Sequence, residues 1–177
     1  MLNKYVVALL ALEPKLFESE AQKSFANIID EYVAGPESYP HITLCQFYTD
    51  KENIAKIDED LAEVKTFPQP RFNGLHFIKS YLPNLWGAEL SIAREAKLVD
   101  FHKQIVAILK KHNIASYVTE TGDLFRPHLT LARINRLQIN HFNEELLKKC
   151  EFSLTLGEVS KIGQYKKTLT TYAAKMK

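Results

Sequence analysis

The chain of 177 residues has little cysteine, little net charge and no long apolar run. Two cysteines are too few for a disulfide framework and lack the spacing of metal ligands, a pattern typical of proteins from a reducing compartment. A net charge of only +2 gives no indication of nucleic-acid binding by itself. With 46% hydrophobic and 25% charged residues, the composition is that of an ordinary globular protein, and we expect a single domain over residues 1–177.

The most apolar stretch, residues 5–12, resembles the core of a short signal peptide. It is followed by Glu13-Pro14-Lys15, which does not resemble a cleavage site made of small residues. Eight residues are also far too few to cross a bilayer as a helix. We therefore interpret this stretch as a buried strand, and expect a cytoplasmic protein with no membrane segment.

Two short segments of the chain read almost alike. Pro40-His-Ile-Thr-Leu44 and Pro127-His-Leu-Thr-Leu131 each follow a glycine, Gly35 or Gly122, that stands six residues before the histidine. A single His-x-Thr on a strand is more often structural than functional. Two copies, each with the same glycine and proline spacing, favour a paired site delivered by matching loops.

The chemistry of the pair depends on which side chains share a face. Residues i and i+2 of a strand point to the same side, so each histidine shares a face with its threonine, and the apolar residues face the other way. By the same alternation, the small residues Cys45 and Ala132 are expected to continue the face of the histidines and to keep the floor of a cleft open.

Two imidazoles and two hydroxyls around one centre match phosphoryl transfer without a metal. One of His41 and His128 would accept a proton from the attacking oxygen, and the other would protonate the leaving oxygen. The hydroxyls of Thr43 and Thr130 would donate hydrogen bonds to the phosphate oxygens. The two motifs are so similar that the sequence leaves open which histidine is the acid and which the base. No cofactor or metal is expected.

Hydrophobic periodicity places these motifs in two halves of similar order: strand, helix, Gly…Pro loop, His-x-Thr strand, helix, strand. This order predicts an α+β fold, bilobal with a pseudo-two-fold duplication, in which two mainly antiparallel sheets face each other across a central cleft with helices outside. The lobes are expected to intertwine, with motif strands near 41–48 and 128–134. Strands are expected at 4–12, 41–48, 71–80, 85–92, 128–134, 152–162 and 167–174, and helices at 14–32, 51–64, 93–112 and 139–150.

Both motifs, whose histidines stand 87 positions apart, resemble the paired signatures of the 2H phosphoesterase superfamily, which includes 2′-5′ RNA ligase-like proteins and cyclic phosphodiesterases. The resemblance implies a phosphodiesterase that hydrolyses 2′,3′-cyclic phosphates of RNA ends or nucleotides. It also implies that His41 and His128 are the acid–base pair, that Thr43 and Thr130 bind phosphate, and that RNA-ligase activity is the same mechanism in reverse. We expect a monomer with no obligate protein partner.

The sequence leaves two other functions open. The first is a 2′-5′ oligonucleotide phosphodiesterase that uses the same side chains. The second is a binding module for RNA ends or nucleotides that holds phosphate without turnover.

Further candidate substrate-binding residues lie beside the motifs. Arg126 could bind a phosphate with its guanidinium, or form a surface ion pair. Four aromatic residues in or near loops could stack on a base, although each could equally be packing: Tyr39, Phe125, Tyr81 and Trp86. Lys166 and Lys167 could border the cleft from the last strand, in a basic segment that carries a net +5 over residues 146–177. The remaining histidines, including His102, are interpreted as structural or exposed.

Overall fold

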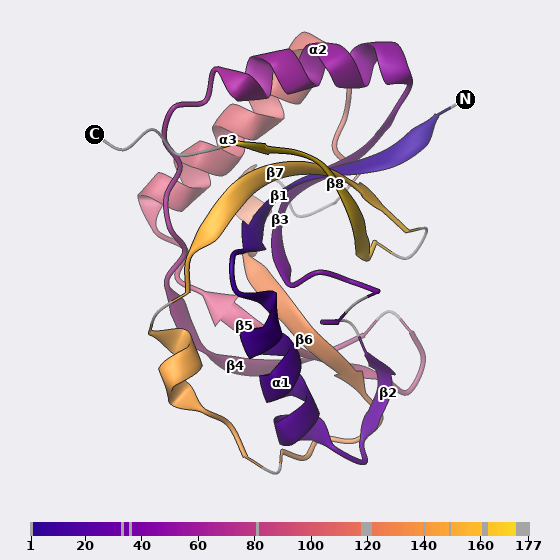
Figure 1. Ribbon diagram of the computed structural model, residues 1–177, viewed down its shortest axis with the longest axis vertical. Coiled ribbons are helices and arrows are strands. Elements are labelled where there is room, and N and C mark those ends of the chain that lie inside the picture. Colours follow the sequence, from indigo (N-terminus) through magenta and orange to yellow (C-terminus); the bar gives the residue numbers. More distant parts are fainter. Residues whose placement is uncertain are drawn as a thin grey trace.

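The computed structural model describes residues 2–32, 34–35, 37–80, 82–117, 122–139, 141–148, 150–160 and 163–172. Within these residues, eight strands form two antiparallel four-stranded sheets (Figure 1). In order across the first sheet the strands are β3 (His41–Thr49), β1 (Asn3–Ala11), β7 (Phe152–Val159) and β8 (Tyr165–Tyr172). The second sheet consists of β2 (Ile29–Tyr32), β6 (His128–Ile134), β5 (Trp86–Ile92) and β4 (Phe72–Lys79). The expected α+β fold with two antiparallel sheets is confirmed.

Three helices pack on these sheets. Helix α1 (Pro14–Phe25) lies against β6, and α3 (Ala96–Lys111) lies against β3 with α2 (Lys51–Ala62) beside it (Figure 1). Pro14 opens α1, where its missing N–H costs no hydrogen bond, and the side chain of Asp50 caps α2 by accepting the Asn53 N–H at 2.9 Å. These sequence-level start signals are therefore found at the true helix starts.

The two halves of the chain exchange strands. Strand β1 pairs with β3 of its own half on one side and with β7 of the second half on the other. In the second sheet β5 pairs in the same way with β6 and with β4 of the first half. The rings of Phe17, Phe72 and Phe152, with centroids 6.0–6.2 Å apart, join α1 to the starts of the two exchanged strands. Neither sheet is therefore complete within one half.

The register around the two motifs is matched. His41 lies opposite Leu10 of β1, and His128 lies opposite Ser91 of β5. The next residue of each neighbouring strand donates its backbone N–H to the proline that precedes the histidine. The bond from Ala11 to the Pro40 carbonyl is 3.1 Å long, and that from Ile92 to the Pro127 carbonyl is 3.3 Å long. The pseudo-two-fold relation thus extends from the motif side chains to the backbone that supports them.

Each motif strand also carries a shift in register immediately after its threonine. Val7 lies opposite Cys45 and Ala8 opposite Thr43, so that Leu44 has no partner on β1, and Leu131 occupies the same position on β6. An extra residue of this kind interrupts the simple alternation of faces. The expectation that Cys45 and Ala132 floor a cleft is wrong, because both residues are fully buried in the apolar core.

Two expected helices differ from the structure. The helix expected over residues 14–32 ends at Phe25, because Ala26 is extended and Asn27 adopts a positive φ of 71°, and the chain then forms β2 against β6. The helix expected over residues 139–150 is a single 3₁₀ turn, η2 (Glu144–Leu147). Asn143 caps this turn by accepting the Glu145 N–H, while its own N–H donates to the buried Glu20 carboxylate, which fixes the turn to the surface of α1.

No helix in the described part of the chain is both long and apolar enough to cross a membrane.

Candidate active site

The motif strands β3 and β6 contact each other where the two sheets meet. The histidine and threonine of each motif are partly exposed, whereas their apolar neighbours are at most 2% exposed. The buried neighbours are Ile42, Leu44, Leu129 and Leu131. The alternation predicted for residues 41–44 and 128–131 therefore positions both imidazoles and both hydroxyls away from the core.

The two motif histidines are held in the same tautomer. Nδ1 of His41 donates to the backbone carbonyl of Tyr39 at 2.7 Å, and Nδ1 of His128 donates to the carbonyl of Arg126 at 2.9 Å. A carbonyl can only accept, so Nδ1 of each ring carries a proton and Nε2 is left to exchange one. In both cases the accepting residue stands two positions before the histidine, a relation that the spacing of residues alone does not reveal.

The surroundings of His41 hold its ring in the neutral form. Its ring packs against Tyr165, with centroids 5.3 Å apart. The pKa of His41 is lowered to about 4, chiefly by desolvation of the imidazole. The hydrogen bond to Tyr39 opposes this shift, and a positive charge on His128 adds to it. At neutral pH, Nε2 of His41 therefore bears a lone pair that can accept a proton.

A buried carboxylate lies on the other side of the site. Glu89, 8% exposed on β5, lies opposite Thr130, with Oε1 3.7 Å from Nε2 of His128 and Oε2 2.6 Å from Nη1 of Arg126. The corresponding residue of β1, opposite Thr43, is Ala8. Glu89 was not expected from the sequence, although it is the single charged residue in the stretch 85–92, which is a usable signal.

Arg126 takes the second of its two predicted roles. Its guanidinium forms an ion pair with Glu89, and 42% of the side chain is exposed. It is not an isolated surface pair, however, because Glu89 also contacts His128, and the Arg126 carbonyl fixes the His128 ring. Arg126 thus contacts the motif through both its backbone and its carboxylate partner.

His102 of α3 connects the two motif segments. Its ring is fully buried, with Nδ1 donating to the carbonyl of Leu44 at 2.9 Å and Nε2 accepting the Gly122 N–H at 3.1 Å. The ring also stacks on Phe125, with centroids 4.0 Å apart and an angle of 1° between planes. Burial lowers the pKa of His102, which keeps the ring in the neutral tautomer that both hydrogen bonds require.

The aromatic candidates have different surroundings. The prediction that Phe125 could stack on a base is wrong, because its ring is 4% exposed and covered by His102. Trp86 pairs with Ile134, at the end of β6 away from His128. At the usual rise per residue, Trp86 lies roughly 17 Å along β5 from Ser91, the residue opposite His128. Tyr39 is 38% exposed beside His41, and Tyr81 lies outside the described residues.

The two glycine loops are less alike than their sequences. Gly122 has a positive φ of 61° and begins a 3₁₀ turn, η1 (Gly122–Leu124). Gly35 instead exchanges two backbone hydrogen bonds with Ser38, at 2.9 and 3.0 Å. The shared spacing therefore corresponds to two different turns, and the matched features of the site are those on the strands. Among the described residues, no three His, Cys, Asp or Glu side chains come together as a group that could hold a metal ion.

Comparison with known proteins identifies the fold. The sequence matches no protein-family model and no curated protein sequence. Among solved structures, LigT of E. coli in complex with 3′-AMP aligns over 99% of both chains at 13% identity, with a TM-score of 0.60. The chain shares this fold. LigT in complex with NADP⁺ aligns over 98% of both chains at 14% identity with a TM-score of 0.63. A structure described as a phosphoesterase aligns over 99% of this chain and 100% of its own chain, at 14% identity and with a TM-score of 0.64.

Proposed function

We propose that this chain is a 2H phosphoesterase, a phosphodiesterase that hydrolyses 2′,3′-cyclic phosphates of RNA ends or nucleotides without a metal. The observation that carries the proposal is the matched pair of Nδ1–H···O=C hydrogen bonds, which leaves Nε2 of His41 and of His128 available on strands that contact each other. Fold likeness to LigT, which was crystallised with nucleotides, supports a nucleotide-like substrate.

The proposed reaction is an in-line displacement at phosphorus. A water oxygen forms a bond to phosphorus while one imidazole Nε2 takes a proton from it, and the bond from phosphorus to the 3′ oxygen breaks. The other imidazole gives a proton to that departing oxygen, so the product carries a 2′-phosphate and a 3′-hydroxyl. Thr43 and Thr130 donate hydrogen bonds to the non-bridging oxygens and hold the phosphorus in place as charge develops.

The asymmetry of the site favours one assignment of roles for this step. His41, whose pKa is lowered to about 4, supplies the base, because its Nε2 is unprotonated at neutral pH. His128, with the Glu89 carboxylate 3.7 Å from its Nε2, supplies the acid, because that carboxylate compensates the charge of an imidazolium. The roles interchange when the reaction runs backwards, with a hydroxyl in place of water, and joining of RNA ends then uses the same site.

The test uses purified protein with a nucleoside 2′,3′-cyclic phosphate and, separately, a 2′-5′ dinucleotide, each in the presence of EDTA. We expect the cyclic phosphate to be opened to a 2′-phosphate. His41→Ala and His128→Ala should each lower kcat by about 10²–10⁴-fold, the usual contribution of general acid–base catalysis. The exposed His141, between β6 and η2, provides the matched control, and His141→Ala should keep full activity.

Three outcomes would contradict the proposal. Loss of activity in EDTA would exclude a metal-free mechanism. Turnover of the 2′-5′ dinucleotide alone would assign the site to the other phosphodiesterase activity. Binding of the cyclic phosphate with no product after long incubation would indicate a binding module.

A further inference from the structure

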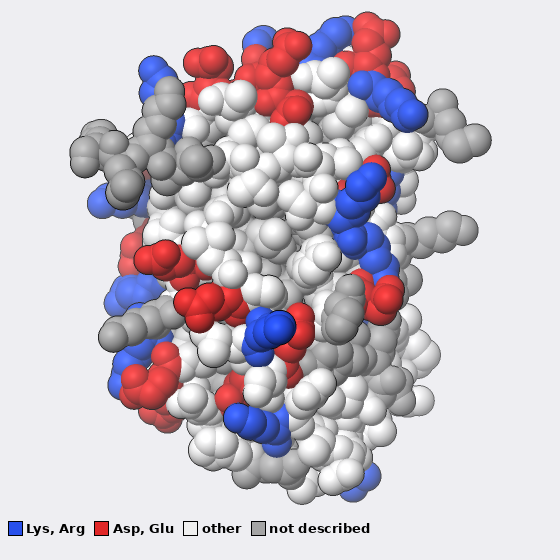
Figure 2. Space-filling model, in the orientation of Figure 1, with Lys and Arg blue, Asp and Glu red and all other residues white. Residues whose placement is uncertain are grey.

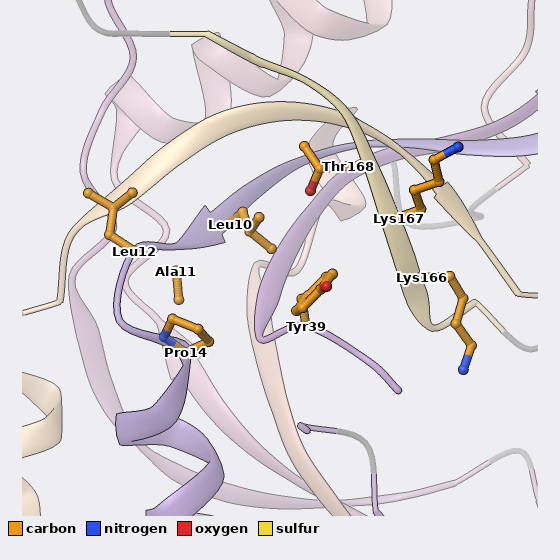
Figure 3. Close-up of a pocket in the computed structure, with 8 residues that line it drawn as sticks. All are labelled: Leu10, Ala11, Leu12, Pro14, Tyr39, Lys166, Lys167 and Thr168. Atoms are coloured by element: carbon orange, nitrogen blue, oxygen red, sulfur yellow. The ribbon is translucent and has the colours of Figure 1, made fainter. Parts of the chain in front are cut away.

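A pocket of about 440 Å³ opens beside His41, outside the acid–base pair itself. One side of it is apolar and is formed by residues 10–12 at the end of β1 and by Pro14 (Figure 3). The other side consists of Tyr39 and of residues 166–168 on β8. We propose that this pocket binds a second nucleotide of the substrate, so that the enzyme acts on RNA ends in preference to mononucleotides. The inference rests on the proposed function.

The pocket is joined directly to the candidate active site. Leu10, which lines it, is the cross-strand partner of His41. Tyr39, which also lines it, accepts the Nδ1–H of His41 through its carbonyl while its ring extends into the pocket wall (Figure 3). A ligand in the pocket therefore lies beside Tyr39, the residue whose carbonyl fixes the His41 imidazole.

The lining has the chemistry that a nucleobase requires. Leu10, Leu12 and Pro14 offer an apolar surface, and 54% of Leu12 is exposed and open to a ligand. The ring of Tyr39 is held edge-on against Tyr165, with centroids 6.1 Å apart, so it is a fixed platform. The volume is within the range of small-molecule sites, about 300–1,000 Å³.

The basic side of the pocket suits a phosphate group. In Figure 3 the ammonium ends of Lys166 and Lys167 lie on the side away from Leu12 and Pro14, and Figure 2 shows basic side chains gathered over β8 beside a broad uncharged area. Lys166 forms an ion pair with Glu37 at 3.0 Å, but the Glu37 side chain is 87% exposed, and such pairs contribute little. A phosphate can replace this carboxylate. A base on the apolar side with a phosphate at the lysines describes one nucleotide.

The substrates for the test differ only in the second nucleotide. We compare kcat/KM for a dinucleotide that ends in a 2′,3′-cyclic phosphate with that for the mononucleoside 2′,3′-cyclic phosphate. The wild-type protein should prefer the dinucleotide by about tenfold, the scale of one stacked base.

Three substitutions test the two sides of the pocket. Lys167→Ala should lower kcat/KM for the dinucleotide by about threefold and weaken its dependence on salt, because one phosphate contact is lost. Leu12→Asp should lower kcat/KM for the dinucleotide by about tenfold. Glu37→Gln, which removes the carboxylate that pairs with Lys166, should raise kcat/KM for the dinucleotide by about twofold. The mononucleotide should be hydrolysed at the wild-type rate by all three variants.

Matched controls lie elsewhere on the surface. Leu137, 55% exposed after β6, is the control for Leu12, and Lys56, which pairs with Glu52 on α2, is the control for the lysines. Leu137→Asp and Lys56→Ala should leave the ratio of the two substrates unchanged.

The outcomes separate this inference from the proposed function. If neither substrate is hydrolysed, the proposed function fails. If both are hydrolysed equally well and the variants change nothing, the pocket is not a nucleotide subsite. If the variants slow both substrates equally, the pocket holds the reacting nucleotide itself, and the preference for RNA ends is wrong.

Discussion

Nε2 of His102 accepts a hydrogen bond from the backbone N–H of Gly122, 3.1 Å away. Because Nδ1 of the same ring donates to the carbonyl of Leu44, one buried side chain links the strand that carries His41 to the loop that leads to His128. The relative position of the two motifs thus depends on a residue that belongs to neither motif.

Replacement of His102 by phenylalanine should destabilise the protein strongly. The ring would still stack on Phe125, but the Leu44 carbonyl and the Gly122 N–H would lose their partners. Each buried, unsatisfied group costs about 1–3 kcal/mol, so the free energy of unfolding should fall by about 2–6 kcal/mol in a urea titration. His141→Phe, at an exposed position between β6 and η2, should change it by less than about 0.5 kcal/mol. Equal stability of the two variants would show that the His102 hydrogen bonds contribute nothing.

Mild acid should destabilise the folded state because two histidines bind protons less readily there than in the unfolded chain. The pKa values of His41 and His102 are both lowered in the folded protein, that of His41 to about 4, while in the unfolded chain both groups titrate near about 6.5. Below that pH the unfolded chain binds protons that the folded chain does not, so the free energy of unfolding should decrease as the pH falls from about 6.5 toward 4.

Denaturant titrations between pH 4.5 and 7.5 measure this effect. The pKa of Asp60 is lowered by Lys111 and His112, so its own contribution is lost only in stronger acid. His41→Asn should make the dependence on pH shallower. A midpoint that stays constant in the wild-type protein over this range would contradict the lowered pKa values.

Substitution of Glu89 by glutamine should affect catalysis more than stability. The amide keeps the shape of the side chain but removes the charge that faces Arg126 and His128. Without the carboxylate, an imidazolium at His128 loses a compensating charge 3.7 Å away, so kcat should fall by at least about tenfold. The control is Glu95→Gln, which removes an exposed pair with Arg71 at 2.8 Å and should leave kcat unchanged. If kcat is the same in both variants, Glu89 has no part in the reaction.

Gly157 has no side chain because Tyr165 occupies the space. A Cβ at this position would collide with the phenol of Tyr165 and with the backbone carbonyl of Lys167, and Tyr165 in turn packs against His41. Gly157→Ala should therefore lower the free energy of unfolding by about 1–3 kcal/mol and reduce kcat by displacing the imidazole. Leu169→Ala, exposed on β8, should do neither. A fully active Gly157→Ala variant would show that Tyr165 does not position His41.

Local patterns predicted much of this fold and the four central side chains of the candidate site. Alternation along residues 41–44 and 128–131 is a property of neighbouring residues, as is the Asp50 cap, and both are found where expected. Strand β2 was not predicted, because its partner β6 lies about a hundred residues further along the chain. The local pattern of residues 26–32 was interpreted as a continuation of the helix and does not reveal that pairing.

The second layer of the site was also missed for reasons of distance. His102 and Glu89 act through groups 20–58 residues away along the chain, so their roles appear only when the sheets are assembled. The register shifts after Thr43 and Thr130 likewise depend on the neighbouring strands. They explain why simple alternation holds up to each threonine and fails at Cys45 and Ala132.

The exchange of β4 and β7 has a consequence for synthesis of the protein. A nascent chain that has emerged from the ribosome as far as Ile134 already contains both histidines and both threonines. It still lacks β7 and β8, and with them Gly157, Tyr165 and the basic side of the pocket. Of the described strands, β7 and β8 come last in the chain, and β8 supplies the Tyr165 ring that packs against His41. A nascent chain therefore contains its four motif side chains before it contains the residue that packs against the first imidazole.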